Sequence, residues 1–122
     1  MLTSIEYLVP ILHVCDLDAV SQFFVKLGFE EQWRMGEPAH RAGLYFGPRG
    51  SEYVIHLMKR EDASDAGARI YIQVPNVDEV YAGCVASGLT PRDLADRPYG
   101  MRDFDVVGPE EILVGIGTEI EH

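Results

Sequence analysis

The fold is decided by two matching stretches, Val14-Cys15-Asp16-Leu17-Asp18-Ala19-Val20 and, sixty residues later, Val74-Pro75-Asn76-Val77-Asp78-Glu79-Val80. The first runs on to Leu27-Gly28-Phe29 and the second to Ser87-Gly88-Leu89, so the offset holds without a gap. A repeat of this kind indicates one supersecondary unit used twice. Two matched halves are expected to leave a concave surface between them, and the function is expected there.

Each stretch is predicted to begin a helix. Asp16 is a natural N-cap, and Gly28 supplies the left-handed residue that ends the first helix. In the second copy Asn76 is the predicted N-cap, Glu79 completes a capping box, and Gly88 ends the helix. The stripes predicted to be buried are Leu17, Val20, Phe24 and Leu27 in the first helix, and Val77, Val80, Tyr81, Cys84 and Val85 in the second.

Segments rich in β-branched and aromatic residues precede and follow each helix, as is typical of strands. We predict strands over 7–14, 31–35, 42–46 and 53–58 in the first copy, and over 70–74, 90–94, 101–107 and 112–116 in the second. The polar segment 59–68 is predicted to link a first module, 1–60, to a second, 68–122. The predicted fold class is α+β, with two βαβββ modules forming curved mixed sheets around a cleft. Each module leaves a face and edges open, so a homodimer is expected.

Composition limits the class of function. The 122 residues are 47% hydrophobic, enough for one domain with a core. Twenty acidic residues against ten basic ones give a net charge of -10, which argues against nucleic acid and anionic membranes as partners. The same charge would gather cationic small molecules, or serve solubility alone. With two cysteines, no apolar span and no secretory signal, the sequence predicts a soluble cytoplasmic protein.

Three motifs follow one another along the chain: Val9-Pro10-Ile11-Leu12-His13-Val14-Cys15-Asp16-Leu17-Asp18, then Phe23-Phe24 with Leu27-Gly28-Phe29, and the tail Arg97-Pro98-Tyr99-Gly100-Met101-Arg102-Asp103-Phe104. Together with the repeat they resemble the vicinal oxygen chelate superfamily, which includes glyoxalase I, extradiol dioxygenases, fosfomycin resistance proteins and bleomycin resistance proteins. The resemblance covers essentially the whole chain, and it implies one domain over 1–122. Gly108-Pro109-Glu110-Glu111 departs from the Asp-Pro-Asp-Gly turn that is usual after the tail.

Enzymes of this superfamily hold one divalent metal on four strand positions, two from each copy. The resemblance places Val9, His56, Arg69 and Gly115 at these positions. Valine and glycine have no donor atom and a guanidinium is no ligand, so His56 is left alone. The sequence therefore predicts no metal and no cofactor, and it argues against an enzyme. His56 is interpreted either as a hydrogen-bonded structural histidine or as a ligand contact.

The resemblance is closer to the bleomycin resistance branch, which lacks the metal and binds a cationic, flat-ringed antibiotic in clefts at a dimer interface. It implies ligand-binding residues that are aromatic or charged, namely Trp33, His56, Tyr71, Tyr99, Arg69 and Arg102. Aromatic faces offer stacking area, although Trp33 and Tyr71 lie on strands and are equally compatible with packing. Arg69 by itself would favour an anionic ligand.

The sequence thus predicts a metal-independent small-molecule binding protein of bleomycin resistance type, which sequesters a planar and preferably cationic ligand in a dimer-interface cleft. Two alternatives stay open. One is a metal-dependent glyoxalase- or dioxygenase-like enzyme of the same superfamily, and the other is a member with a vestigial cleft. Antibiotic resistance and an unrelated binding role are both compatible with the sequence.

Overall fold

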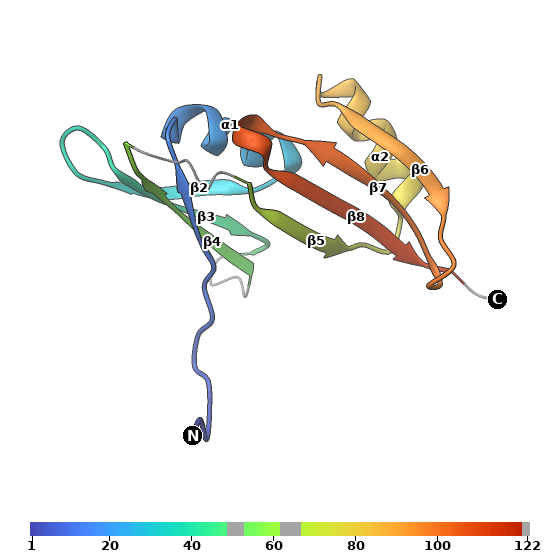
Figure 1. Ribbon diagram of the computed structural model, residues 1–122, viewed down its shortest axis with the longest axis horizontal. Coiled ribbons are helices and arrows are strands. Elements are labelled where there is room, and N and C mark those ends of the chain that lie inside the picture. Colours follow the sequence, from blue (N-terminus) through green and yellow to red (C-terminus); the bar gives the residue numbers. More distant parts are fainter. Residues whose placement is uncertain (49–52, 62–66, 121–122) are drawn as a thin grey trace. The chain divides into compact units, whose positions relative to one another are not determined.

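The computed structural model describes residues 1–48, 53–61 and 67–120, and the chain forms two compact units, Met1–Ser64 and Asp65–His122 (Figure 1). The first unit contains β1 (Ile11–Val14), α1 (Leu17–Leu27), β2 (Glu30–Met35), β3 (Arg41–Phe46) and β4 (Tyr53–Lys59). The second contains β5 (Arg69–Gln73), α2 (Val77–Ala86), β6 (Pro91–Asp96), β7 (Met101–Val107), a 3-10 turn at Pro109–Glu111 and β8 (Leu113–Glu119). The predicted α+β fold with two βαβββ modules is confirmed.

The two sheets have the same topology. The strand order is β1-β4-β3-β2 in the first unit and β5-β8-β7-β6 in the second. In each sheet the first strand pairs in parallel with the last, and the remaining pairs are antiparallel. The sequence repeat is therefore a repeat of structure, and each sheet is open, with its first and second strands at the edges.

Local sequence signals define α1 as predicted. The Asp16 carboxylate accepts a hydrogen bond of 3.0 Å from the Ala19 amide and so caps the helix. Gly28 ends it with a φ of 113°, which favours glycine. The apolar stripe packs through aromatic edges, because the Phe24 ring centroid lies 5.2 Å from that of Phe23 and 5.5 Å from that of Phe29. Phe24 is completely buried.

The predicted capping box of α2 is wrong. Asn76 is the N-cap residue, but its side chain makes no capping bond and instead donates to Glu79 over 2.9 Å. The Val77 amide donates to the hydroxyl of Thr118 on β8, over 2.9 Å. That hydroxyl in turn donates to the Val74 carbonyl. A distant strand therefore satisfies the first amide of the helix, and the Asn76 side chain caps none of the helix amides.

The predicted buried stripe of α2 is correct at its centre and wrong at one end. Val77 and Cys84 are buried, and the Tyr81 ring meets Phe104 of β7 edge-on at 5.2 Å. Val85 is 55% exposed, because it lies on the flank of the stripe rather than on the line that faces the sheet. The helix stops at Ala86, just before the left-handed Gly88.

The strand bounds differ from the predicted ranges mainly at β1 and β8. The strand predicted from residue 7 begins only at Ile11, just after Pro10, a residue without an amide proton for the ladder. β8 begins at Leu113 and continues to Glu119, beyond the predicted end. Of the predicted linking segment 59–68, residues 62–66 lie outside the described residues.

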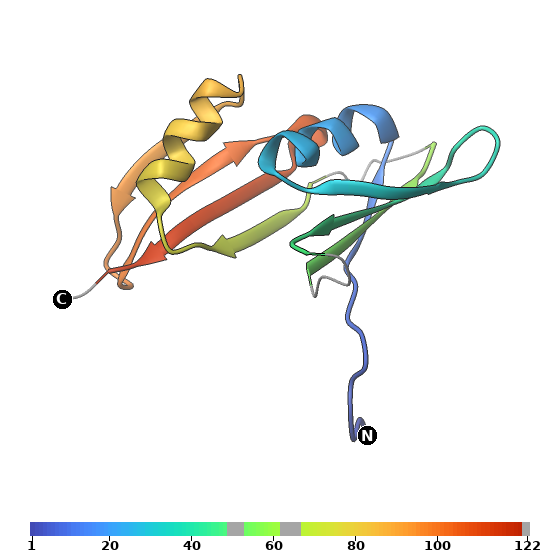
Figure 2. The same ribbon diagram turned by 180° about the vertical axis from the view of Figure 1, so that it is seen from behind.

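Each helix covers one face of its own sheet, and the opposite face is here called the open face (Figure 2). Side chains alternate between the faces along every strand. In the first unit Ala42, Leu44 and Leu57 are buried on the α1 side. In the second unit Phe104 and Val106 are buried on the α2 side. Their strand neighbours point to the open faces, where the polar and aromatic groups of interest lie.

No helix in the described ranges is long and apolar enough to cross a membrane.

Candidate functional site

A buried carboxylate organises the open face of the second unit. Asp103 on β7 is 6% exposed, and its Oδ2 accepts hydrogen bonds from the hydroxyls of Tyr71, over 3.0 Å, and Tyr99, over 2.6 Å. Its Oδ1 accepts from Nε of Arg97 over 2.7 Å. We call Tyr71, Arg97, Tyr99 and Asp103 the Asp103 cluster. It ties β5 and the turn between β6 and β7 to one side chain of β7.

Two glycines of β8 let the Tyr71 ring lie against the sheet. Tyr71 is paired with Gly115 in the register of β5 and β8. A Cβ at Gly117 would lie 2.1 Å from the Tyr71 hydroxyl oxygen and 2.9 Å from the Asp103 Cβ. A Cβ at Gly115 would lie 2.9 Å from the Tyr71 ring. The ring therefore needs the space that only glycine leaves.

A tight turn brings Tyr99 to the same carboxylate. The Arg97 amide donates to the Met101 carbonyl over 2.7 Å, and the Gly100 amide donates back to the Arg97 carbonyl over 3.2 Å. Gly100 has a φ of 84°, in the region that favours glycine. The Arg97 guanidinium also donates to the backbone carbonyl of Asp93. Arg97 thus holds the turn and the carboxylate together.

The pKa values of the cluster favour fixed protonation states at neutral pH. Burial, followed by the hydrogen bond to Asp103, raises the pKa of Tyr71 to about 12. The hydrogen bond to Asp103 is the largest cause that raises the pKa of Tyr99. Burial would raise the pKa of Asp103, but hydrogen bonds from Tyr99, Arg97 and Tyr71 outweigh it and the pKa is lowered. The phenols keep their protons and the carboxylate stays ionised, so these groups are poor general acids and bases near pH 7.

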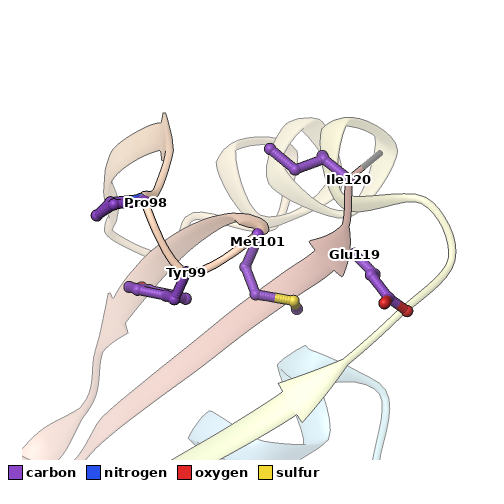
Figure 3. A pocket seen from close by; sticks show the side chains of 6 residues that line it. Pro98, Tyr99, Met101, Glu119 and Ile120 are labelled. Atoms are coloured by element: carbon purple, nitrogen blue, oxygen red, sulfur yellow. The ribbon is translucent and has the colours of Figure 1, made fainter. Parts of the chain in front are cut away.

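A pocket of about 450 Å³ opens beside Tyr99 (Figure 3). It lies between the β6–β7 turn and the end of β8. Its volume is in the range of small-molecule sites. The lining residues are Pro98, Tyr99, Gly100, Met101, Glu119 and Ile120. The pocket therefore combines an aromatic ring, a thioether and a carboxylate.

The first unit carries a related arrangement on its own open face. The indole Nε1 of Trp33 donates to the Tyr45 hydroxyl over 2.9 Å, and the Trp33 ring meets the His56 ring edge-on at 4.8 Å. Nη2 of Arg41 lies 3.4 Å from Nδ1 of His56. A Cβ at Gly43 would lie 2.3 Å from the indole ring. We call Trp33, Arg41, Tyr45 and His56 the Trp33 cluster.

The imidazole of His56 is held neutral near pH 7. Burial is the larger cause that lowers its pKa, and the charge of Arg41 lowers the pKa further. A neutral imidazole can accept the Arg41 proton at Nδ1 and present its other nitrogen as a donor. His56 is thus hydrogen-bonded, as the structural interpretation expects, and its ring contacts Trp33; its contact with a ligand stays a prediction.

The predicted arginines lie apart from these aromatic groups or are already paired. Arg69 is on the open face of the second unit, where it forms an ion pair of 3.5 Å with Asp105. Arg102 points to the helix side of the sheet, where Nε lies 2.9 Å from Asp78 and Nη1 lies 3.2 Å from Asp96. Of the six predicted residues, the structure joins Trp33 to His56 and Tyr71 to Tyr99.

Sequence reasoning missed the residues that hold the aromatic rings in place. Asp103 was noted only as part of the tail motif, while Arg97 and Tyr45 were not considered as site residues. The sequence signal that could have found Asp103 is the alternation in β7, where Asp103 and Asp105 alternate with the apolar Phe104 and Val106. Two acidic residues on the face of a strand that turns away from the core indicate a polar cluster.

The positions at which the resemblance would place metal ligands are engaged in other contacts. The Tyr71 ring covers Gly115, and Arg69 is paired with Asp105. In the described part of the chain, no three His, Cys, Asp or Glu side chains are grouped so that they could hold a metal ion. The hydrogen bonds to Asp103 instead anchor the rings of Tyr71 and Tyr99.

The model of the Glyoxalase/Bleomycin resistance protein/Dioxygenase superfamily matches residues 4–104. The chain belongs to this superfamily. Solved structures of other proteins share the fold at low sequence identity, and a search of the curated proteins gives no match.

Three solved structures are similar to this protein over nearly its whole length. A bleomycin-binding protein complexed with bleomycin is 18% identical with a TM-score of 0.73, and the match covers 94% of this chain and 99% of that chain. The bleomycin-binding protein from bleomycin-producing Streptomyces verticillus, complexed with copper(II)-bleomycin, is 23% identical with a TM-score of 0.73, covering 98% and 100%. TnmS3, an antibiotic binding protein from Streptomyces sp. CB03234, is 16% identical with a TM-score of 0.78, covering 98% and 99%.

Proposed function

We propose that this superfamily member is a metal-independent small-molecule binding protein of bleomycin resistance type, which sequesters a planar ligand of cationic character. One observation carries the proposal. On the open face of the second unit, the exposed rings of Tyr71 and Tyr99 are anchored by their hydroxyls to a buried carboxylate. The antibiotic-binding function of the similar solved proteins supports the same conclusion.

The exposed rings suit stacking on a flat ligand. Tyr71 is 47% and Tyr99 is 65% exposed, so each offers ring surface to a ligand. Because the hydroxyls are fixed to Asp103, less side-chain freedom remains to be lost on binding. Large, rigid aromatic surfaces are the usual anchors of such sites. In the first unit the indole of Trp33 is likewise fixed at its polar end, by the hydrogen bond to Tyr45.

Sequestration fits the chemistry of the Asp103 cluster better than catalysis. An enzyme site needs a group that exchanges a proton or polarises a bond near neutral pH. Here the carboxylate has a lowered pKa and is occupied by three donors, and the Tyr71 phenol has a pKa of about 12. Such groups hold their positions and charges, and that is what a binding surface requires.

The proposal includes a cytoplasmic homodimer with the ligand in a cleft at its interface. Each sheet has two edge strands, and the open face of the second sheet carries the exposed rings of Tyr71 and Tyr99. Surfaces of this kind are commonly completed by a second copy. Light scattering on the purified protein is expected to give twice 13.6 kDa, unchanged on dilution to low micromolar concentration. A monodisperse monomer would contradict this part of the proposal.

Binding and metal content test the function together. Titration calorimetry with bleomycin is expected to give saturable binding, and elemental analysis to find less than stoichiometric metal. Trp33→Ala, Tyr71→Ala and Tyr99→Ala are each expected to weaken binding by about 1 to 3 kcal/mol, as for buried aromatic anchors. Tyr53→Ala is the matched control, since Tyr53 points away from the open face of its sheet.

Two outcomes would contradict the proposal. About one zinc, nickel, iron or manganese ion per chain, lost in a His56→Ala variant, would favour the metal-dependent enzyme. Unchanged affinity in all three aromatic variants would place the ligand elsewhere. Binding of a cationic ligand should also weaken as salt rises, because the net charge of -10 acts at long range.

A further inference from the structure

The hydroxyls of the Asp103 cluster have no proton left for a ligand. A phenol has one proton to donate and lone pairs with which to accept. Tyr71 and Tyr99 both give that proton to Oδ2 of Asp103. Both phenols also keep their protons at neutral pH, because their pKa values are raised. Toward a bound molecule, the two oxygens can therefore act only as acceptors.

The buried carboxylate strengthens these acceptors. A hydroxyl that donates to an anion becomes more negative at its oxygen, since chains of hydrogen bonds polarise one another. The bond from Tyr99 to Asp103 is short, at 2.6 Å, as expected for a charge-assisted bond. Because both hydroxyls bind the same carboxylate oxygen, at 3.0 and 2.6 Å, the two phenol oxygens lie near one another, and we expect one planar group with two N–H donors to match them.

The arginines of the second unit are all engaged with carboxylates. The unit contains four arginines and no lysine. The ion pairs are Arg69 with Asp105 at 3.5 Å, Arg92 with Asp93 at 3.9 Å, Arg97 with Asp103 at 2.7 Å, and Arg102 with Asp78 at 2.9 Å. A ligand carboxylate or phosphate would therefore meet arginines whose positive charge is already balanced by a neighbouring carboxylate. The expectation that Arg69 favours an anionic ligand is thus not supported by its position.

The pocket beside Tyr99 presents further acceptors. Glu119 lines it, and within residues 67–120 no side chain forms an ion pair or hydrogen bond with this carboxylate. The backbone amides of Gly100 and Ile120, which also line the pocket, already donate to the carbonyls of Arg97 and Gly100. A ligand in this pocket therefore meets the Tyr99 phenol and the Glu119 carboxylate, and the Tyr71 hydroxyl is bound to the same oxygen of Asp103 as the Tyr99 hydroxyl.

We propose that Tyr71, Tyr99 and Glu119 select a planar cation that carries N–H donors, such as an amidinium, a guanidinium or a protonated aminoheteroaromatic group, and discriminate against carboxylates. The selection rests on the proposed function, and it names the chemical class that the second unit recognises. A cation without N–H donors would gain the stacking and the charge attraction but leave the phenol oxygens unmatched. An anionic ligand would be disfavoured, because the oxygens of Tyr71, Tyr99 and Glu119 can only accept hydrogen bonds from it.

The experiment compares three probes of similar size on the full-length protein: 2-naphthamidinium, N-methylquinolinium and 2-naphthoate. The first has a positive charge and N–H donors, the second has the charge alone, and the third is an anion with acceptors. Calorimetry or protein-observed NMR titration is expected to give the order 2-naphthamidinium, then N-methylquinolinium about tenfold weaker, with 2-naphthoate weakest.

Phenylalanine variants separate the hydroxyl from the ring. Tyr71→Phe and Tyr99→Phe keep the aromatic face, so each is expected to weaken 2-naphthamidinium binding about tenfold and N-methylquinolinium binding less than about twofold. Glu119→Gln should weaken both cations to a similar extent. Tyr81→Phe is the control, because Tyr81 packs against Phe104 on the helix side of the sheet.

The outcomes distinguish this inference from the proposed function. Equal binding of the two cations, unchanged in the phenylalanine variants, would overturn donor selection and leave a stacking site. Tighter binding of 2-naphthoate would overturn the cation class while keeping a binding protein. Failure of all three probes to bind, in a protein that still binds bleomycin, would overturn the second unit's pocket as the recognition site. Failure of the probes and of bleomycin would overturn both proposals.

Discussion

The hydroxyl of Tyr99 donates a hydrogen bond of 2.6 Å to Oδ2 of Asp103, and this bond joins a ring that is 65% exposed to a carboxylate that is 6% exposed. Exposed aromatic side chains usually move between rotamers. Here the ring is anchored at its polar end, while its faces stay accessible. The relationship explains how a turn at the end of a small sheet can present a fixed aromatic surface, and it makes Asp103 the residue on which that surface depends.

Asp103→Asn is expected to destabilise the protein by about 1 to 3 kcal/mol, because the charge that three donors require is lost while the donors remain. Urea unfolding measures the change. Asp105→Asn is the matched control on the same strand and face. Its ion pair with Arg69 is longer and more exposed, so a loss below about 0.5 kcal/mol is expected. Equal losses in the two variants would contradict the special role of Asp103.

The stability difference between the protein and its Asp103→Asn variant should depend on pH. The folded-state pKa of Asp103 is lowered from the usual value of 3.8. The stability that this carboxylate contributes is therefore fully present above the unfolded-state pKa, and it is lost as pH falls through the folded-state pKa. Unfolding curves are expected to give a constant difference between pH 5 and 7 that narrows below about pH 4. A difference that widens in acid would contradict the assignment.

Tyr71 is expected to ionise with a pKa of about 12. Because this value is raised above that of a free phenol, the stabilisation is fully present below about pH 10 and is lost as pH rises through 12. NMR of ring-labelled tyrosine measures it directly, and Tyr71→Phe assigns the signal. In Asp103→Asn the pKa should fall only part of the way toward 10, since burial is the larger cause. A return to 10 in that variant would make the carboxylate the sole cause.

The elements set by neighbouring residues could be predicted from sequence. Asp16 and Gly28 define α1 because a cap and a left-handed stop act within one turn of the helix. At the equivalent position the Asn76 side chain donates to the Glu79 carboxylate instead of capping the helix, and Thr118, 41 residues away, binds the Val77 amide, a contact that the local sequence does not indicate. The likeness of the two sheets followed from the repeat, since two copies of the same pattern are expected to fold in the same way, whereas the order of the strands came only from the structure.

The candidate site could be predicted only in part, for the same reason. Aromatic residues in likely binding positions, such as Tyr71 and Tyr99, are visible in the sequence. Their common partner Asp103 is visible as a residue but not as a partner, because it lies 32 positions from Tyr71 and meets it only through the pairing of β5, β8 and β7. The role of Gly117 under the Tyr71 ring depends on the same register.

Gly117→Ala is expected to displace Tyr71, because the new Cβ would lie 2.1 Å from its hydroxyl oxygen and 2.9 Å from the Asp103 Cβ. A destabilisation of about 1 to 3 kcal/mol is expected in urea, with weaker ligand binding. Gly83→Ala is the control, because its Cβ would meet nothing within 4 Å and alanine favours the interior of α2. That variant should gain about 0.5 to 1 kcal/mol. A stable Gly117→Ala variant with unchanged binding would contradict the packing of Tyr71.

The fluorescence of Trp33 should report the protonation of His56. Trp33 is the single tryptophan of the chain, and its ring meets the His56 ring at 4.8 Å. A protonated imidazole quenches indole emission on contact. Because burial and Arg41 lower the pKa of His56, emission is expected to stay constant through pH 7 and to fall only as pH drops below 6.5. The stability contributed by the neutral ring is lost over the same range, as pH falls through the lowered pKa.

His56→Gln should abolish the transition. His13→Gln is the control, because the His13 ring contacts Arg60 instead. A transition that persists in His56→Gln would show that another group quenches Trp33, and it would remove His56 from the aromatic surface of the first unit.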